Sequence, residues 1–432
     1  TRLEGSWHLL GPLPLTASGG DPEAPRPILL ARDGRLEASS TGGRDEALWS
    51  VDLPLDGIEV DRPELWSMGV DTVIVASADS PATVVGIDAA TGRTAWTRDF
   101  GVGSVESLAS TSGVVVAWMR ERGERRPHRA IGLDTTTGAE LWSRTLPSGL
   151  LWWAPLAGDG HVAIVASDLN GPNRAAILDA FTGSQRAVLE LPDDLGSREA
   201  TLPWIEQDRL ILPSLMAYSV SAIDLDQLQV AWRYDVPDSL TLYAILRHGG
   251  RFYLHAASES LRADADPGLL IEFNPRLGSS RTVERLGQGE RLIGVGFGER
   301  LELESPYVFH TSTAASGNLR LSAIDLRRGR RWSRELEVRS TQFYDEQWAR
   351  AVVSGSSVAM MWAQRERIGG ERHHVWLDLF GLEDGTSRAH RLVRMGYTGL
   401  REIELFPFGD ELWIAGRGER NVGDWIDLWS DR

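Results

Sequence analysis

Short runs of apolar residues recur along the chain, and most of them follow a Gly or Asp turn. Eight such runs are three or four residues long and lie at 73–75, 114–116, 162–165, 210–212, 252–254, 307–309, 358–361 and 412–414. Runs this short, rich in β-branched and aromatic residues and bounded by turn residues, are typical of buried strands rather than helices. No pattern of helical period extends beyond about two turns. The hydrophobic pattern therefore predicts an all-β protein.

Between these runs the chain repeats a second pattern, in which a strand ends in Asp-x-x-Thr-Gly and a Trp follows four residues after the Gly. The two complete copies consist of Asp88, Thr91, Gly92 and Trp96, and of Asp134, Thr137, Gly138 and Trp142. Weaker copies retain Asp179, Thr182 and Gly183, then Asp224 and Trp232, and then Asp325, Gly329 and Trp332. The position of the Trp recurs at 49, 96, 142, 187, 232, 282, 332 and about 389. A spacing of this size is typical of a repeat architecture.

The residue types of the repeat fit a tight turn followed by an outer strand. An Asp side chain can accept hydrogen bonds from backbone N–H groups two residues further on, and Gly can adopt a positive φ. A Trp that opens the outer strand can cover the boundary to the next unit. A ring of metal ligands or general acids is the alternative for the repeated Asp residues. Each Asp occupies the same turn of a different repeat, however, and this separates them, so we interpret the motif as structural.

Four-stranded antiparallel units of about 45 residues arranged radially are propeller blades. We therefore predict a single domain, residues 1–432, that forms an eight-bladed β-propeller. The first outer strand, 48–51, has no full blade before it, and the last apolar run, 412–414, has no Trp phrase after it. We expect residues 28–53 and 400–430 to form one composite blade, because pairing the N- and C-terminal strands leaves no open sheet edge. Its third strand is either 425–429 or 35–38, and residues 1–27 are expected to be an N-terminal arm.

Composition excludes several kinds of partner and chemistry. The chain has 45 basic and 61 acidic residues, a net charge of −16, and no Cys. A polyanion such as nucleic acid, or an anionic membrane surface, is an unfavourable partner for so acidic a protein. Without Cys there is no disulfide, thiolate metal site or Cys nucleophile. No stretch of 18 apolar residues predicts a membrane-spanning helix.

Large aromatic residues recur just before the second strand of several repeats. They are Trp66, Trp152, Trp153, Trp204, Trp348 and Phe406. In a propeller the segment that enters each blade lies near the axis, so these side chains could form an aromatic rim that binds a partner protein. The alternative is that they are core packing, which is the commoner fate of large apolar side chains and the interpretation we favour.

The Asp-x-x-Thr-Gly-x-x-x-Trp phrases at 88–96 and 134–142 resemble the tryptophan-docking repeat of the pyrroloquinoline-quinone (PQQ)-like β-propellers. One branch of that family contains PQQ-dependent alcohol and glucose dehydrogenases, which resemble one another in a vicinal Cys pair and a calcium site. This sequence has no Cys and no matching cluster of calcium ligands. It is similar instead to the non-catalytic, BamB-like branch, and this resemblance implies neither a cofactor nor catalytic residues.

The sequence leads to a functional hypothesis with two alternatives. We expect a non-enzymatic scaffold, periplasmic or extracellular, that binds other protein subunits of a bacterial envelope complex. It is not expected to bind nucleic acid or to insert into a membrane. The first alternative is an enzyme, either a PQQ- or metal-dependent oxidoreductase or a hydrolase that uses the central channel. The second is a sensor domain that binds a sugar or small ligand through the aromatic rim.

Overall fold

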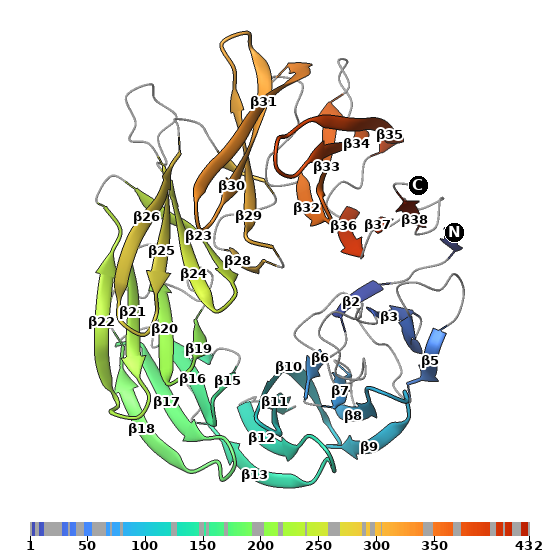
Figure 1. Cartoon of the computed structure of the whole chain (residues 1–432). Helices are drawn as coiled ribbons and strands as arrows, with labels where there is room; N and C mark the ends of the chain where they lie inside the picture. The colour runs from blue at the N-terminus through green and yellow to red at the C-terminus, as the bar shows by residue number, and fades with distance from the viewer. Residues whose placement is uncertain are drawn as a thin grey trace. The chain divides into compact units, whose positions relative to one another are not determined.

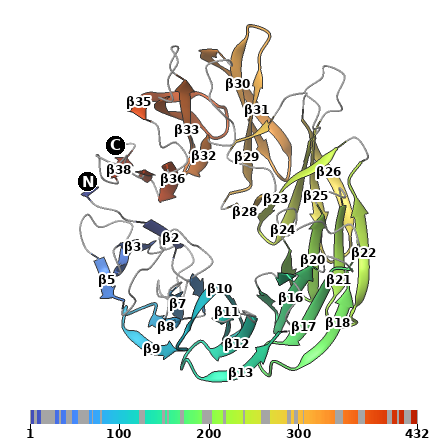
Figure 2. The same cartoon turned by 180° about the vertical axis from the view of Figure 1, so that it is seen from behind.

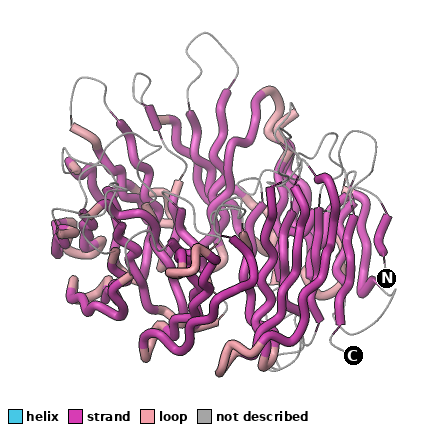
Figure 3. Tube along the Cα trace, turned by 90° about the horizontal axis from the view of Figure 1, so that it is seen from above, coloured by secondary structure: helices cyan, strands magenta, loops and turns pink. Residues whose placement is uncertain are grey.

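The structure is a computed structural model and describes a defined part of the chain. The described residues are 2–4, 8–12, 28–32, 35–39, 47–53, 66–69, 71–77, 81–121, 128–146, 151–152, 155–167, 172–191, 203–214, 219–237, 240–257, 268–286, 291–293, 299–303, 305–339, 349–365, 373–397, 403–408, 411–416 and 425–430. Within these ranges every regular element is a β-strand, and the trace contains no helix (Figure 3). No helix of the described residues is long and apolar enough to span a membrane. The prediction of an all-β protein is confirmed.

The strands, β1 to β38, form nine sheets of four or five strands, and the chain divides into two compact units. The N-terminal unit contains Ser6–Pro213 and Ser221–Trp232. The C-terminal unit contains Thr1–Gly5, Ser214–Val220 and Arg233–Arg432. Each unit is described by itself below.

The N-terminal unit contains four sheets and most of a fifth, which follow one another in chain order (Figures 1 and 2). Their strands are β2 (His8–Pro12), β3 (Ile28–Arg32), β4 (Arg35–Ser39) and β5 (Ala47–Asp52); β6 (Trp66–Met68), β7 (Thr72–Ala76), β8 (Thr83–Asp88) and β9 (Thr94–Asp99); β10 (Gly103–Thr111), β11 (Val114–Glu121), β12 (His128–Asp134) and β13 (Glu140–Thr145); β14 (Leu151–Trp152), β15 (Leu156–Gly158), β16 (His161–Ser167), β17 (Arg174–Asp179) and β18 (Gln185–Glu190); and β19 (Trp204–Glu206), β20 (Arg209–Ser214), β21 (Ser219–Asp224) and β22 (Gln229–Asp235).

The C-terminal unit contains the remaining sheets. Their strands are β23 (Thr241–His248), β24 (Arg251–Ala257), β25 (Leu269–Asn274), β26 (Ser279–Arg285) and β28 (Glu299–Glu302); β27 (Arg291–Leu292), β29 (Tyr307–Thr313), β30 (Asn318–Asp325) and β31 (Gly329–Arg339); β32 (Arg350–Ser354), β33 (Ser357–Arg365), β34 (His373–Gly381) and β35 (Ser387–Tyr397); and β36 (Ile403–Phe408), β37 (Glu411–Gly416) and β38 (Trp425–Ser430) with β1 (Arg2–Glu4). All described pairings are antiparallel except that of β28, which adds to the edge of β23 in parallel.

The hydrophobic cores lie between consecutive sheets, which explains why the second strand of a sheet has apolar residues on both of its faces. In β7, Val73 and Val75 pack with residues of β3–β5, whereas Ile74 and Ala76 pack with residues of β10–β12. Successive side chains of a strand point to opposite faces, so a strand covered on both faces must be apolar at every position. The outer strand β9 shows the opposite pattern, because its exposed residues surround a single buried side chain, that of Trp96.

The prediction of a composite blade built from residues 28–53 and 400–430 is wrong. Residues 28–52 supply β3–β5, which pair with β2, while β36–β38 form a separate sheet with β1. Both candidates for the third strand, 35–38 and 425–429, are therefore strands, but of different sheets. The physical reason is that residues 1–27, which were expected to be an arm, contribute β1 and β2. β2 pairs with β3 and β1 pairs with β38, so the two segments that were expected to share one blade each pair with a strand from this region. The described residues consequently form nine sheets, where eight units were expected.

The two ends of the chain nevertheless pair with each other in the C-terminal unit. Arg2 pairs with Asp427, Leu3 with Ile426 and Glu4 with Trp425, all antiparallel. Figure 1 shows the N- and C-termini close together at this sheet. The strand that begins the chain is thus held by the strand that ends it.

Candidate functional site: tryptophan docking between sheets

The repeated Trp side chains bridge one sheet to the turn of the next by a buried hydrogen bond. In the N-terminal unit the indole Nε1 of Trp96 donates to the carbonyl oxygen of Thr135 at 2.9 Å, and that of Trp142 donates to Ala180 at 2.7 Å. Each acceptor directly follows the turn Asp of the next repeat. The indole N–H is thereby satisfied inside an apolar boundary, where an unpaired donor would be costly.

Two further Trp residues make the same bond. Trp49 donates to the carbonyl of Ala89 at 3.0 Å in the N-terminal unit, and Trp332 donates to that of Leu382 at 2.7 Å in the C-terminal unit. Trp232, which belongs to the same motif in the sequence, is only half-buried on β22. Four of the repeats therefore make the docking bond. They include the repeat of Trp49, which lies before the two complete copies of the motif in the chain.

The docked indoles of Trp96 and Trp142 have a glycine on both sides. A Cβ atom added to Gly138, whose φ is +66°, would lie 2.5 Å from the ring of Trp96. A Cβ added to Gly86, which is paired with Trp96 across β8 and β9, would lie 2.2 Å from the same ring. Gly183 stands against Trp142 as Gly138 stands against Trp96, at 2.5 Å. The Gly of Thr-Gly is therefore needed for its positive φ and also because the indole fills the space where a side chain would be.

The turn Asp residues act as the sequence suggests, by accepting hydrogen bonds from their own turn. The Oδ1 atom of Asp134 accepts hydrogen bonds from the backbone N–H groups of Thr136 and Thr137, and a third from the Thr137 hydroxyl at 2.9 Å. The hydroxyl bond is the main reason why the pKa of Asp134 lies below its ordinary value. Asp179 accepts the same three hydrogen bonds, and Asp88 accepts those from the N–H and the hydroxyl of Thr91. These carboxylates are occupied by their turns, which is a structural role.

An Arg two residues after the Trp adds a second docking contact that we did not predict. Nε of Arg98 donates to the carbonyl of Gly138 at 2.7 Å, and Arg144 and Arg334 donate in the same way to Gly183 and Gly385 at 3.2 and 2.6 Å. The signal was present in the sequence, because each of these Trp residues begins a Trp-Ser/Thr-Arg triplet. Trp49 is followed by Ser50 and Val51 and lacks this contact.

At one boundary of the N-terminal unit, between the sheet of β14–β18 and the sheet of β19–β22, other residues stand in place of the Trp and both of its glycines. Ala187 stands opposite Ile177, where the preceding sheet pairs Trp142 with Gly132. In the following turn Leu228 takes the position of the Gly and keeps a positive φ of 57°. Leu228 packs against the cluster of buried side chains between these two sheets. The space that an indole fills elsewhere is thus filled by aliphatic side chains from both neighbours.

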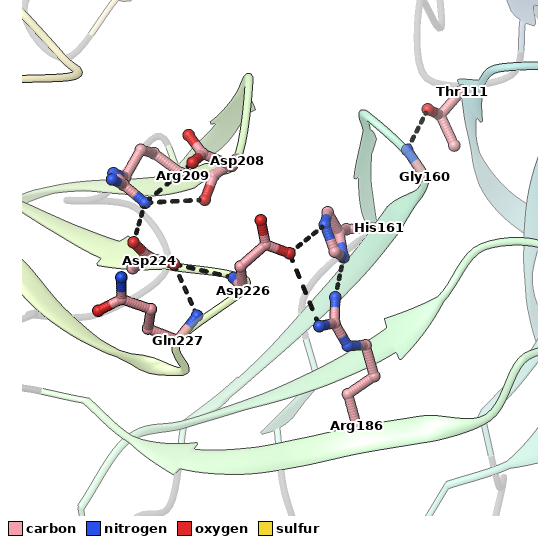
Figure 4. A network of polar contacts seen from close by, with 9 residues as sticks. All are labelled: Thr111, Gly160, His161, Arg186, Asp208, Arg209, Asp224, Asp226 and Gln227. Atoms are coloured by element: carbon pink, nitrogen blue, oxygen red, sulfur yellow. Dashed lines mark hydrogen bonds and ion pairs between the residues drawn. The ribbon is translucent and has the colours of Figure 1, made fainter.

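A polar network crosses this same boundary (Figure 4). Nη1 of Arg186 donates to Nδ1 of His161 at 3.0 Å, since a guanidinium can only donate, and Nη2 lies 3.7 Å from Asp226. Burial, followed by the charge of Arg186, holds the pKa of His161 below its ordinary value. Nearby, Arg209 pairs with Asp224, whose other oxygen caps the turn. Because Asp226 is exposed, its ion pairs contribute little to stability.

The residues of the expected aromatic rim are described only in part. Trp204 is 6% exposed and belongs to the buried interior, so it is not available for a partner in this structure. Trp66, Trp152 and Phe406 lie on β6, β14 and β36, but their side chains are outside the described residues. Trp153 and Trp348 lie outside the described residues altogether. The partner-binding rim therefore stays a prediction for those five side chains.

The described residues offer no site that fits the quinone and calcium of the dehydrogenase branch. No group of three or more His, Cys, Asp or Glu side chains that could hold a metal ion occurs among them. The chain also lacks the Cys residues that would pack against a quinone. The repeated Asp residues are separated by whole sheets and hydrogen bonded within their turns.

The fold and the docked boundaries define an all-β repeat protein with tryptophan-docking motifs. A family model described as outer membrane protein assembly factor BamB matches residues 32–146 and 128–352. The chain belongs to this family of PQQ-like repeat proteins, as the two complete motifs suggested. A search of curated proteins found no significant match.

Several solved structures are similar along most of the chain but only at low identity. BamB from Moraxella catarrhalis is 12% identical, with 100% of both chains covered and a TM-score of 0.42. The dihydro-heme d1 dehydrogenase NirN is 13% identical over 92% of this chain and 78% of that one, with a TM-score of 0.45. The quinohemoprotein alcohol dehydrogenase from Comamonas testosteroni is 12% identical over 99% and 76%, with a TM-score of 0.40. Similarity at this level supports no conclusion about activity.

Proposed function

We propose that the protein is a non-enzymatic scaffold, a β-propeller that binds other protein subunits of a bacterial envelope complex. The observation that carries this proposal is the match to the BamB family model between residues 32 and 352. In this proposal the sheets are blades, and the pairing of β1 with β38 holds the ends of the chain together within one sheet. The protein would act in the periplasm or outside the cell.

The docked boundaries supply a physical reason for a binding role. At each of them an indole, its hydrogen bond and two close-packed neighbours hold one sheet against the next, so the frame resists deformation. Segments that join strands at the surface of such a frame can vary in length and side chains without disturbing it. Specificity for a partner then comes from those segments, and their display costs little conformational entropy on binding.

The proposal is tested by isolating the partner and rebuilding the complex. The tagged full chain, cross-linked in an envelope fraction, should capture a defined protein, identified by mass spectrometry. The purified partner should then co-elute with the chain in size-exclusion chromatography with light scattering. A reconstituted complex of fixed stoichiometry supports the scaffold. The proposal fails if no candidate partner re-forms a complex.

The enzymatic alternative is tested separately with the same preparation. The chain is incubated with PQQ and calcium ions, dialysed, and examined for a stoichiometric quinone absorbance and for dye-linked oxidation of alcohols and aldoses. Stoichiometric retention with turnover would replace the scaffold by a dehydrogenase. We expect no retained quinone, because the chain has no Cys and its described residues contain no group of three or more His, Asp or Glu side chains that could hold a metal ion.

A further inference from the structure

Five Arg residues of two neighbouring sheets of the C-terminal unit gather at one surface, which we call the arginine surface: Arg251, Arg281, Arg327, Arg328 and Arg330. Arg251 and Arg281, from β24 and β26, both donate hydrogen bonds to the carboxylate of Glu272 on β25. Burial raises the pKa of the Tyr253 phenol, and the charges of Arg251, Arg327 and Arg281 all oppose that rise, which places Arg327 near the other two.

The second sheet reaches the first through Arg330. Its backbone N–H donates to Oε2 of Glu284 at 3.1 Å, and its Nε lies 3.5 Å from Oε1 of the same side chain. Glu284 occupies β26, on which Thr282 stands where other repeats carry the docking Trp. The turn between β30 and β31, with Arg327 and Arg328, is thereby held against the outer strand of the neighbouring sheet.

The arginine surface carries more positive charge than its own carboxylates neutralise. Five guanidinium groups face three carboxylates, those of Glu272, Glu284 and the turn residue Asp325, which leaves a surplus of two charges in a chain whose net charge is −16. The side chains of Arg251 and Arg281 are 58% and 59% exposed, and Arg327 and Arg328 are exposed as well. The excess is therefore open to a ligand.

The hydrogen-bonding capacity of this surface is also only partly used. A guanidinium has five N–H donors, and in the bonds to Glu272 Arg251 uses its Nη1 and Arg281 its Nε and Nη2. The side chains of Arg327 and Arg328 make no hydrogen bond or ion pair with the described residues. The Tyr253 hydroxyl is buried and has no hydrogen-bond partner among the described atoms.

Glu272 shows that a carboxylate is stable in this environment. Burial by itself would raise the pKa of Glu272, but the hydrogen bonds from Arg281 and then Arg251 outweigh that effect and hold it below the ordinary value. A second carboxylate that approaches from solvent would meet the same guanidinium groups from their unused edges.

The turn itself does not need its two arginines. In the complete repeats a Thr hydroxyl donates to the turn Asp, as Thr91 does to Asp88. In Asp325-Leu326-Arg327-Arg328-Gly329 the corresponding Thr position is Arg328, and Asp325 keeps the bond from the backbone N–H two residues on, that of Arg327, at 2.8 Å. Neither arginine side chain is used in closing the turn, so both are free to serve binding.

We propose that the arginine surface binds an acidic segment of a partner protein, with the partner's Asp and Glu side chains pairing with Arg327, Arg328 and the free edges of Arg251 and Arg281. Paired N–H donors of a guanidinium match the geometry of a carboxylate. Leu277, in the turn between β25 and β26, is 70% exposed and precedes Arg281 by four residues, so an apolar side chain of the partner could also contact this turn. Nucleic acid or a membrane would extend past this limited surface and meet the acidic remainder of the chain.

This inference rests on the proposed scaffold function, whose partner it describes chemically. The direct test is fluorescence anisotropy of the full chain with a labelled synthetic peptide of alternating Glu and Leu, and with the same peptide carrying Gln for Glu. We expect the Glu peptide to bind, the Gln peptide to bind at least about tenfold more weakly, and the affinity to fall as salt is raised.

Variants locate the binding site on the chain. Arg327→Glu and Arg328→Gln should each weaken binding of the Glu peptide, Arg327→Glu by about tenfold or more because it adds repulsion to the loss of a charged hydrogen bond. Arg93→Glu makes the same charge change in an exposed turn of the N-terminal unit and should leave binding unchanged. Thermal unfolding of each variant shows whether it is folded. A Lys–Leu peptide should bind Arg327→Glu more tightly than it binds the unaltered chain.

Three outcomes would overturn the inference. They are no binding of the Glu peptide, equal loss of binding in Arg93→Glu and Arg327→Glu, and binding of a labelled oligonucleotide or of phosphatidylglycerol vesicles at this surface in place of the peptide. If the peptide fails while a reconstituted partner complex survives Arg327→Glu, the arginine surface is excluded and the scaffold function stands.

Discussion

The indole of Trp142 lies against Gly183 in the turn of the next sheet, so close that a Cβ atom on that glycine would be 2.5 Å from the ring. The Trp and the Gly are 41 residues apart in the chain and belong to different repeats. The repeat is therefore not a self-contained unit, because each Trp is completed by the turn of its neighbour. At the following boundary the Trp is replaced by the smaller Ala187 and the Gly by the larger Leu228.

Gly138→Ala should destabilise the N-terminal unit by about 2–4 kcal/mol. A positive φ costs a non-Gly residue roughly 1 kcal/mol, and overpacking against Trp96 adds about 1–3 kcal/mol. Gly101→Ala is the matched control, because Gly101 has a φ of +75° and nothing within 4 Å of the added Cβ. Urea unfolding measures both variants. Equal losses would show that the docked indole contributes nothing to the requirement for Gly.

Trp142→Ala and Gly183→Leu should compensate each other in part, as the pair Ala187 and Leu228 suggests. Trp142→Ala alone should cost about 3–5 kcal/mol because it leaves a cavity. Gly183→Leu should be severely destabilising beside the indole but much less so in its absence. A double-mutant cycle should give a coupling of about 1–3 kcal/mol in favour of the double variant. Additive losses would contradict this prediction.

Arg98→Met should lower the free energy of unfolding by about 1 kcal/mol. The substitution removes the hydrogen bond from Arg98 on β9 to the carbonyl of Gly138 in the following turn, but it keeps the aliphatic part of the side chain. The loss should depend little on salt, since the acceptor is uncharged. Arg93→Met is the control, because Arg93 is exposed and makes no side-chain hydrogen bond among the described residues. Thermal unfolding at low and high salt distinguishes the two. A loss that vanishes at high salt would point to an ion pair instead.

Asp378 should make stability depend on pH in the direction opposite to the turn Asp residues. Asp378 is 6% exposed, and burial raises its pKa above 3.8 although His390 and Trp362 donate hydrogen bonds to it. The folded state therefore favours the protonated form. The contribution of Asp378 to the stability of the folded state is therefore present at a pH below its ordinary pKa. It is lost as the pH rises through the raised pKa of the folded state.

Asp378→Asn should for this reason gain stability relative to the unaltered chain as the pH increases from about 3.8 towards neutrality. Asp134→Asn is the contrasting variant, since the pKa of Asp134 is lowered and its contribution is present above 3.8 and lost as the pH falls. Urea unfolding between pH 3 and pH 7 measures both. Parallel pH profiles for the two variants would refute the assignment.

Much of the architecture was predictable from local patterns. Continuous apolar runs such as 73–75 identified strands buried on both faces, and the Asp-x-x-Thr-Gly turn was readable because an Asx turn depends on neighbouring residues only. The role of Gly138 was only half predictable. Its positive φ is local, but its contact with Trp96 joins two repeats.

The short edge strands were missed for a physical reason. β1 and β2, of three and five residues, have no repeat phrase and no long apolar run, and only their neighbours' unpaired backbone groups specify them as strands. The same applies to the arginine surface. No local pattern indicates which strand the turn with Arg327 and Arg328 contacts, and only the contacts of Arg330 with Glu284 hold that turn against β26.

The amino-acid sequence by itself determined the all-β class, the repeat, its turns and the family, because those follow from periodicity and from hydrogen bonds within a few residues. Only the tertiary structure decided which segments share a sheet, which turn receives each indole, and where the arginines of two repeats converge. The docking bonds, for example, join residues between 38 and 50 positions apart, and they depend on packing between sheets that no local pattern encodes.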